Sequence, residues 1–236
     1  MMLWLKGWLE TRFRFLFMLA LTALPLYQMH LIGAHASAGS VSGIAGAFSS
    51  HVFPFFIVFA SAFLAGAGIA TQTPFQASKG LLGSSLFTLS MPVSRLRLLV
   101  VRAGIGWLET AAVIGILCWE MWLAMPLQRA GVTTIEMFEQ AATLIACSST
   151  FYFLAVLLGT VLEDQWRVFG TLIASAGIWL LCTRFSLPAF ADIAHGIGKR
   201  SPIVAHTIPW NVTVFSLGLS AILFFMALTI AQRREY

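Results

Sequence analysis

The stretch FTLSMPVSRLRLLVVRAGIGWLE, residues 87–109, joins a basic rim to a long apolar run that then carries an acid. Arg95, Arg102 and Glu109 recur every seven residues, so a helix would place them along one face. Glu109 lies 11 residues beyond Leu98, the predicted inner edge of the run. At about 1.5 Å of rise per residue, this distance places Glu109 near the centre of a bilayer. An acid at that depth costs roughly 2.5–3.5 kcal/mol, so we expect Glu109 to face protein or a water-filled path.

The role of Glu109 stays open between two interpretations. It is either a structural buried acid, bonded to hydroxyls of another span, or part of a substrate path or gate. Pairing with Arg102 would have to cover about 10 Å of helix rise, so we expect the partner of Glu109 to come from elsewhere in the chain. Arg95 either marks the membrane topology or belongs to a surface that binds a partner protein.

The composition indicates a chain that folds in lipid. Of the 236 residues, 59% are apolar and only 10% are charged, with a mean hydropathy of +0.88. Soluble domains are about half apolar and a quarter charged. The basic residues behind the net charge of +5 are scattered at the ends of apolar segments, which indicates membrane topology rather than a nucleic-acid surface. We therefore predict an all-α membrane protein with a single transmembrane domain over residues 1–236.

Six apolar stretches approach the roughly 20 residues that cross a bilayer as a helix. They are residues 15–32, 52–70, 98–119, 141–162, 168–185 and 210–231. The fifth runs into Arg184 early, so we expect it to tilt or to be short. Tryptophans mostly lie near the predicted span ends, where interfacial anchors are expected. They are Trp107, Trp119, Trp122 and Trp210.

The distribution of Lys and Arg predicts that both termini are cytoplasmic. With that orientation, ten basic residues lie on the inner side and four on the outer side. The inner ten are Lys6, Arg12, Arg14, Lys79, Arg95, Arg97, Arg102, Arg167, Arg233 and Arg234, and the outer four are Arg129, Arg184, Lys199 and Arg200. The first outer loop, residues 33–51, contains neither Lys nor Arg.

The N-terminal residues 1–14 have a helical pattern of their own. Charged side chains recur every four positions on one face, and Trp4, Leu5, Trp8 and Leu9 occupy the other. This pattern is typical of an amphipathic helix that lies in the headgroup plane. Two alternatives are a plain basic flank of the first span and a signal peptide ending at Ala34-His35-Ala36. Continuation of the apolar run to Ile32 and the two tryptophans favour the interfacial helix.

Two loops have unusual sequences. The cytoplasmic segment 71–97 predicts a short helix over Phe75–Leu86, a break near Met91 and a long helix from Pro92, since proline suits the first turn of a helix. Such a helix between two spans is a docking element for a soluble partner. The outer segment 186–209 is apolar, too short to span and interrupted by Pro and Gly, so we expect it to be re-entrant or interfacial.

Several kinds of site have no sequence signature in this chain. It lacks the G-x-x-x-x-G-K-[ST] loop that binds nucleotide phosphates, and no organised catalytic cluster is visible. The five histidines have no metal-binding spacing, so we expect no metal site and no cofactor on this chain. Cys118, Cys147 and Cys182 lie inside apolar runs, which predicts small core side chains rather than disulfides.

The run Thr88-Leu89-Ser90-Met91-Pro92-Val93-Ser94-Arg95, followed by Arg102-Ala103 and Glu109, resembles the membrane subunits of ABC-2 type transporters. In these permeases a TLSLPVSR-like stretch follows the second span, and Met91 here replaces the more usual leucine. The resemblance extends to the layout of an N-terminal amphipathic helix, six spans, and short helices before the last span.

The resemblance implies a permease, most often of an exporter, in the bacterial cytoplasmic membrane. Such a permease pairs with itself or with a second permease and with two copies of a separate ATPase, which binds ATP and Mg. The loop after the second span would contact that ATPase through Phe75, Gln76, Lys79, Leu82, Leu86, Phe87, Pro92 and Arg95. Arg102 and Glu109 would belong to the substrate path or be buried polar residues. A non-transporting anchor subunit and a membrane-integral enzyme are the alternatives.

Overall fold

The computed structural model describes residues 2–27, 52–65, 94–124, 132–162, 164–185, 188, 190–197 and 202–233. All regular elements in these ranges are helices, which confirms the all-α prediction for this part of the chain. They are α1 (Met2–Leu21), α4 (Val52–Ala65), α7 (Arg95–Ala124), α8 (Thr134–Val161), α9 (Asp164–Arg184), α10 (Ile193–Ile197), α11 (Pro202–Ala205) and α12 (Trp210–Arg233).

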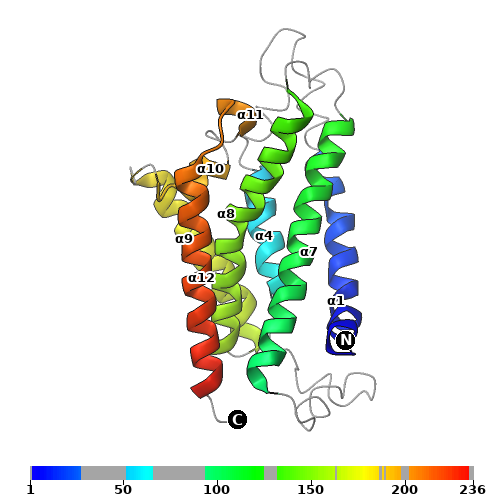
Figure 1. Cartoon of the computed structure of the whole chain (residues 1–236), viewed down its shortest axis with the longest axis vertical. Coiled ribbons are helices and arrows are strands. Elements are labelled where there is room, and N and C mark those ends of the chain that lie inside the picture. Colours follow the sequence, from blue (N-terminus) through cyan, green and yellow to red (C-terminus); the bar gives the residue numbers. More distant parts are fainter. Residues whose placement is uncertain are drawn as a thin grey trace.

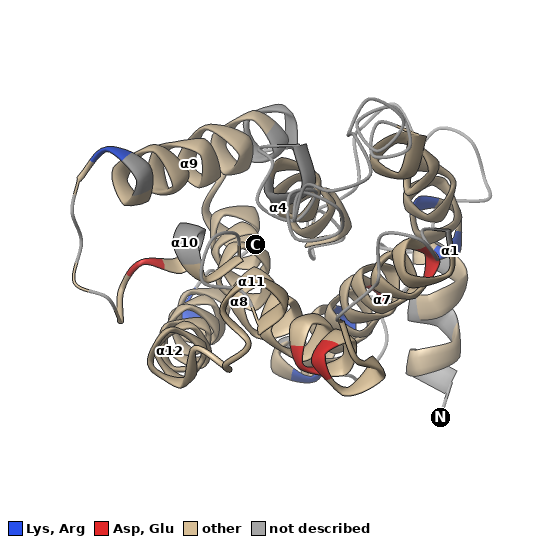
Figure 2. Cartoon of the chain, turned by 90° about the horizontal axis from the view of Figure 1, so that it is seen from above, with Lys and Arg blue, Asp and Glu red and all other residues tan. Residues whose placement is uncertain are grey.

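Helix α8 lies at the centre of the bundle. It packs against α4, α7, α9 and α12, and the short helices α10 and α11 also contact it. Viewed along the helices, α1 lies beyond α7 and packs against α7 and α4 (Figure 2). Apolar side chains fill the interior, with Ile57, Val113, Leu117 and Leu144 fully buried.

The chain begins and ends at the same end of the bundle. α1 starts, α7 starts and α12 finishes at that end (Figure 1). Arg97 and Arg102, from the first turns of α7, and Arg233, from the last turn of α12, lie there as well. We call this side the arginine end, and the opposite side, where α11 lies, the far end.

Three helices are long and apolar enough to cross a membrane. They are Leu96–Leu123, Thr134–Val161 and Trp210–Arg233. Two shorter apolar helices, Phe55–Ala65 and Phe169–Cys182, lie within the second and fifth predicted spans. The described residues are therefore compatible with a multi-pass membrane protein, although fewer helices reach full spanning length than the six stretches predicted from the sequence.

The N-terminal helix α1 joins two predicted segments, the interfacial residues and the start of the first span. It continues as one helix across residues 14 and 15. One face of α1 lies along α7, where Thr11 bonds to Glu109 and Trp8 and Phe15 line a shared cavity. The helix ends where the hydroxyl of Thr22 donates to the carbonyl oxygen of Leu19 at 2.6 Å.

Helix α7 begins at Arg95, three residues later than the predicted start at Pro92. Ser94 acts as the N-cap, because its side-chain oxygen accepts from the backbone N–H of Arg97 at 3.3 Å. The helix ends at Ala124, five residues beyond the predicted end of the span.

Helix α8 begins at Thr134, seven residues before the predicted span at residue 141. Thr133 and Glu136 form a capping box. The Glu136 N–H donates to the Thr133 hydroxyl at 3.2 Å, and the Thr133 N–H donates to the Glu136 carboxylate at 2.6 Å. The hydropathy pattern missed the first residues of α8, because the polar residues among them start the helix and lower its apolar character.

The outer segment after α9 folds into the short helices α10 and α11. Ile193, Ile197 and Ile203 are buried, and the N–H of Ile203 donates to the Gln140 side chain of α8 at 3.5 Å. Gly196 packs so closely on Val212 that a side chain there would collide with it. Three isoleucines of this segment are thus buried against the bundle, whereas Phe190 and Val204 are exposed.

Cys118, Cys147 and Cys182 are buried and free, which confirms the prediction that they are core side chains. The predicted helix Phe75–Leu86 and the outer loop 33–51 lie outside the described residues. So do most of the residues predicted to contact an ATPase, namely Phe75, Gln76, Lys79, Leu82, Leu86, Phe87 and Pro92.

Candidate functional site

Glu109 occupies the middle of α7, 14 residues after Arg95 and 15 before Ala124. The helix has 30 residues, whereas about 20 suffice to cross the hydrocarbon. Any 20-residue window of α7 includes residues 105–114, so Glu109 lies at least about 6 Å inside the window edge at 1.5 Å per residue. If α7 crosses a membrane, Glu109 therefore lies inside the hydrocarbon core, and its place near the bilayer centre stays a prediction.

The carboxyl group of Glu109 is held by α1. The hydroxyl of Thr11 donates a short hydrogen bond to Oε1, and both side chains are almost fully buried. Arg14, three residues further along α1, is close enough to interact electrostatically with the carboxylate. The second carboxylate oxygen, Oε2, is buried and has no hydrogen-bond partner among the described residues. The prediction that the partner comes from elsewhere in the chain is confirmed, and that partner is Thr11.

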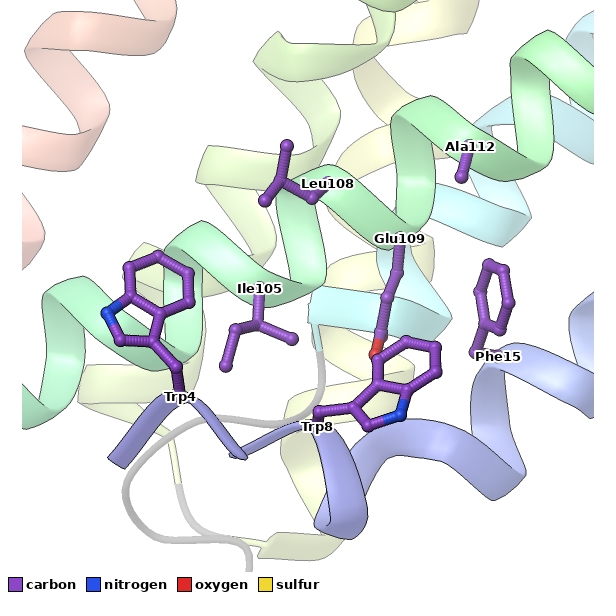
Figure 3. A pocket seen from close by; sticks show the side chains of 7 residues that line it. All are labelled: Trp4, Trp8, Phe15, Ile105, Leu108, Glu109 and Ala112. Carbon is purple, nitrogen blue, oxygen red and sulfur yellow. The ribbon is translucent and has the colours of Figure 1, made fainter. Parts of the chain in front are cut away.

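A cavity of about 430 Å³ lies between α1 and α7, with Glu109 in its wall (Figure 3). The cavity is lined by Trp4, Trp8 and Phe15 of α1 and by Ile105, Leu108, Glu109 and Ala112 of α7. The rings of Trp8 and Phe15 have centroids 5.5 Å apart. The carboxylate extends from α7 toward α1 and ends beside the ring of Trp8 (Figure 3). The cavity is therefore apolar and aromatic except for one carboxylate.

Sequence reasoning missed the part of this site that α1 contributes. Trp4, Trp8, Thr11 and Phe15 follow a spacing of four, three and four residues, which is that of a packed helix face. The sequence predicts tryptophans in the headgroup plane, and their spacing with Thr11 and Phe15 indicates a helix face without distinguishing a lipid contact from a protein contact.

The opposite face of α7 is joined to α8 by polar contacts at similar depth. The hydroxyl of Tyr152 donates to the carbonyl oxygen of Ala103 at 2.9 Å, and the indole N–H of Trp107 donates to Ser149 at 2.8 Å. Gly106 leaves just enough room for the Tyr152 hydroxyl. Trp107 is thus a link between helices in the middle of α7, unlike Trp119 and Trp210, which are exposed and near helix ends.

Further hydroxyls join α8 to α12. Thr150 donates to the carbonyl oxygen of Ser216 at 3.2 Å and lies 3.4 Å from the Ser220 hydroxyl. The Ser220 hydroxyl donates to the Ser216 carbonyl at 2.7 Å. We define the hydroxyl layer as Thr11, Ser149, Thr150, Tyr152, Ser216 and Ser220. Hydrogen bonds of this kind contribute about 0.6–2 kcal/mol each between membrane helices.

Arg95 and Arg102, which were predicted to share a face of α7 with Glu109, both lie closer than Glu109 to the arginine end. Arg102 is half-buried near the arginine end, seven residues before Glu109. Arg95 is the first residue of α7. Glu109 itself is joined to α1 through Thr11.

In the described ranges, no three His, Cys, Asp or Glu side chains come together as a metal site would require. His206 instead lies at the far end, with its Nδ1 atom 2.8 Å from Oε1 of Glu136. This contact links the residue after α11 to the first turn of α8. His30, His35 and His51 lie outside the described residues.

A scan against protein-family models, a search of curated proteins and a search of solved structures return no match to this chain. The fold and the site therefore define a general class of protein and not a family. The described part of the chain is helical and compatible with several crossings of a membrane, and an acid lines an aromatic cavity between its helices α1 and α7.

Proposed function

We propose that the chain is the permease subunit of an ATP-binding cassette exporter of the ABC-2 type in the bacterial cytoplasmic membrane. It works as a dimer, with itself or with a second permease, and is driven by a separate ATPase. The observation that carries the proposal is the position of Ser94, the second serine and next-to-last residue of the TLSMPVSR stretch. Ser94 caps α7 at the arginine end, where α1 also starts and α12 finishes.

The charges at the arginine end support a cytoplasmic assignment. Arg97 and Arg233 are exposed there, and cytoplasmic ends of membrane helices are enriched in such residues. An ATPase that contacts residues 71–97 would meet the bundle at this same end, because residue 94 joins directly to α7. The location of Ser94 thus favours coupling between an ATPase and α7.

The six-span topology is supported by one helix in each predicted apolar stretch. Helices α1, α4, α7, α8, α9 and α12 each overlap one of the six stretches, in order, and α1 shares residues 15–21 with the first. In the proposed topology α1 begins at the cytoplasmic side and leads into the first span, residues 15–32, and α10 and α11 lie on the outer side.

Glu109 and the hydroxyl layer support a translocation role. A subunit that only anchors other proteins needs no buried acid halfway along a span, because such a group opposes insertion. Helix α7 carries both Glu109 and the Ser94 cap, so a movement of the coupling segment would be transmitted to Glu109 along one rigid element.

Copurification with an ATPase tests the proposal. The chain is coexpressed with the ABC ATPase encoded beside it, purified through a tag on the chain, and assayed for ATP hydrolysis in liposomes. We expect a stable complex, and we expect Arg97→Glu to reduce ATPase recovery at least about tenfold by reversing a charge near the contact. The matched control is Arg184→Glu, an exposed arginine at the end of α9, which should leave recovery unchanged.

A chain that never copurifies with the neighbouring ATPase would rule out the transporter proposal. Equal losses for both arginine variants would show that the arginine end is not the docking side. Glu109→Ala in the reconstituted complex separates a permease from an anchor subunit. If the chain is only an anchor, the Glu109→Ala complex should assemble and hydrolyse ATP as the unaltered complex does. If the chain is a permease, the variant complex should assemble but lose substrate-stimulated ATP hydrolysis.

A further inference from the structure

The cavity between α1 and α7 combines aromatic walls with an unsatisfied carboxylate oxygen. Glu109 is 3% exposed, and its Oε2 atom has no hydrogen-bond partner among the described residues. Thr11 engages the other oxygen, Oε1, and so fixes the orientation of the group. Glu109 lines the cavity, and buried polar atoms are nearly always paired, so its unpaired oxygen indicates a missing partner.

The chemistry of the walls limits what that partner is. An inorganic cation such as Mg²⁺ or Ca²⁺ requires about six oxygen ligands, and this cavity offers one carboxylate among apolar side chains. Aromatic rings attract a cation through their faces, and Trp is the strongest of them. Trp4, Trp8 and Phe15 would therefore surround the apolar substituents of an organic cation while Glu109 supplies the opposite charge.

We propose that this cavity binds a lipophilic organic cation of the quaternary ammonium or phosphonium class, with the charge beside Oε2 of Glu109 and the substituents against Trp4, Trp8 and Phe15. The volume of about 430 Å³ is within the range of about 300–1,000 Å³ that small-molecule sites occupy. Trp4 and Trp8 are 46% and 42% exposed, so a ligand dissolved in the membrane can reach the cavity from the side.

Arg14 influences the strength of the site. Its guanidinium interacts electrostatically with Glu109 but does not line the cavity. It reduces the negative potential that a bound cation experiences, so we expect moderate affinity in the unaltered chain. Removing this charge should tighten binding, and such a gain cannot result from damage to the fold.

Two sources supply cations of this chemistry, namely free lipophilic cations and the choline headgroup of phosphatidylcholine. The position of Glu109 in the middle of α7 favours the free cation, since headgroups lie at the membrane surface. As a substrate site the cavity rests on the proposed permease function. As a binding site it stands without that function, because the purified chain can be tested with no ATPase present.

Binding of radiolabelled tetraphenylphosphonium to the purified chain in dodecyl maltoside tests the proposal. Tetraphenylborate has the same shape and the opposite charge, so it separates charge recognition from apolar partitioning. We expect saturable binding of the phosphonium and none of the borate. Addition of phosphatidylcholine or phosphatidylglycerol then identifies the source, because only a headgroup site is competed by the choline lipid alone.

The variants make the test specific to the named side chains. We expect Glu109→Gln to weaken phosphonium binding about 30-fold or more, and Trp8→Leu about 3- to 30-fold, whereas Trp8→Phe keeps most of it. Arg14→Gln should tighten binding about three- to tenfold. The matched control is Glu120→Gln, which alters another glutamate of α7 with a buried, unpartnered oxygen outside this cavity.

Equal binding of phosphonium and borate would overturn the proposal, as would an unchanged affinity in Glu109→Gln. An equal loss in Glu120→Gln would mean that the effect is not specific to this cavity. Failure to copurify with an ATPase would reject the permease function and leave these binding results intact.

Discussion

Replacement of Gly106 by alanine tests the contact that holds α7 against α8. A Cβ atom at this position would collide with the Tyr152 hydroxyl and approach the carbonyl oxygen of Leu64 to 3.4 Å. The ring of Tyr152 is 1% exposed and packs edge-on against Phe153, with centroids 5.2 Å apart. The hydroxyl therefore cannot move aside without breaking its hydrogen bond to Ala103.

The size of the effect follows from three contributions. Overpacking a filled interface costs about 1–3 kcal/mol, and loss of the hydrogen bond costs about 1 kcal/mol more. Alanine in place of glycine within a helix returns about 1 kcal/mol. We expect Gly106→Ala to destabilise the fold by about 1–3 kcal/mol, which at roughly 2–4 °C per kcal/mol lowers the melting temperature by about 2–12 °C.

The three buried cysteines provide the assay, because a thiol-reactive fluorophore labels them only as the bundle unfolds. The control is Gly115→Ala on the same helix, where an added Cβ meets nothing within 4 Å. This variant should melt at or slightly above the temperature of the unaltered chain. If Gly106→Ala melts as high as Gly115→Ala, the close contact with Tyr152 does not hold α7 in place.

Two further substitutions follow from the described contacts, and the same melting assay measures both. Thr133→Ala removes the capping box with Glu136 and should destabilise α8 by about 1 kcal/mol; an unchanged melting temperature would show that the cap does not contribute. Trp107→Phe removes the hydrogen bond to Ser149 and should cost about 0.6–2 kcal/mol, while Trp119→Phe, near the end of α7, should cost less than about 0.5 kcal/mol.

The helices could be predicted from hydropathy because apolar runs in this chain are long and charges are few. The burial of Glu109 could be predicted too, since an acid within an apolar run must avoid lipid. The start of α8 was also readable, because Thr133 and Glu136 match the capping-box signature. A hydropathy threshold missed the start of α8, because such a threshold counts Glu136 as a residue that ends a span.

The contact between α1 and α7 could not be predicted in the same way. The apolar face of Trp4 and Trp8 fits lipid and protein equally well, because lipid tails are as apolar as leucine and provide no contrast. Only the three-dimensional arrangement shows that Thr11 on this face meets Glu109, 98 residues further along the chain. A single hydroxyl within an apolar stripe is common, so no pattern in the chain pairs these two residues.

The energetics of Glu109 favour a role in binding over a role in folding. Placing the acid within the membrane costs roughly 2.5–3.5 kcal/mol, whereas a hydrogen bond between membrane helices contributes about 0.6–2 kcal/mol. Thr11 does not depend on this bond, because the carbonyl oxygen of Trp8 lies 3.4 Å from its hydroxyl and is an alternative acceptor for its one proton. An apolar side chain of similar size would join α1 to α7 at lower cost, and Oε2 adds no bond to the described residues. A carboxylate that weakens its own interface is explained by a charged ligand that completes it, which is the role that the aromatic cavity supports.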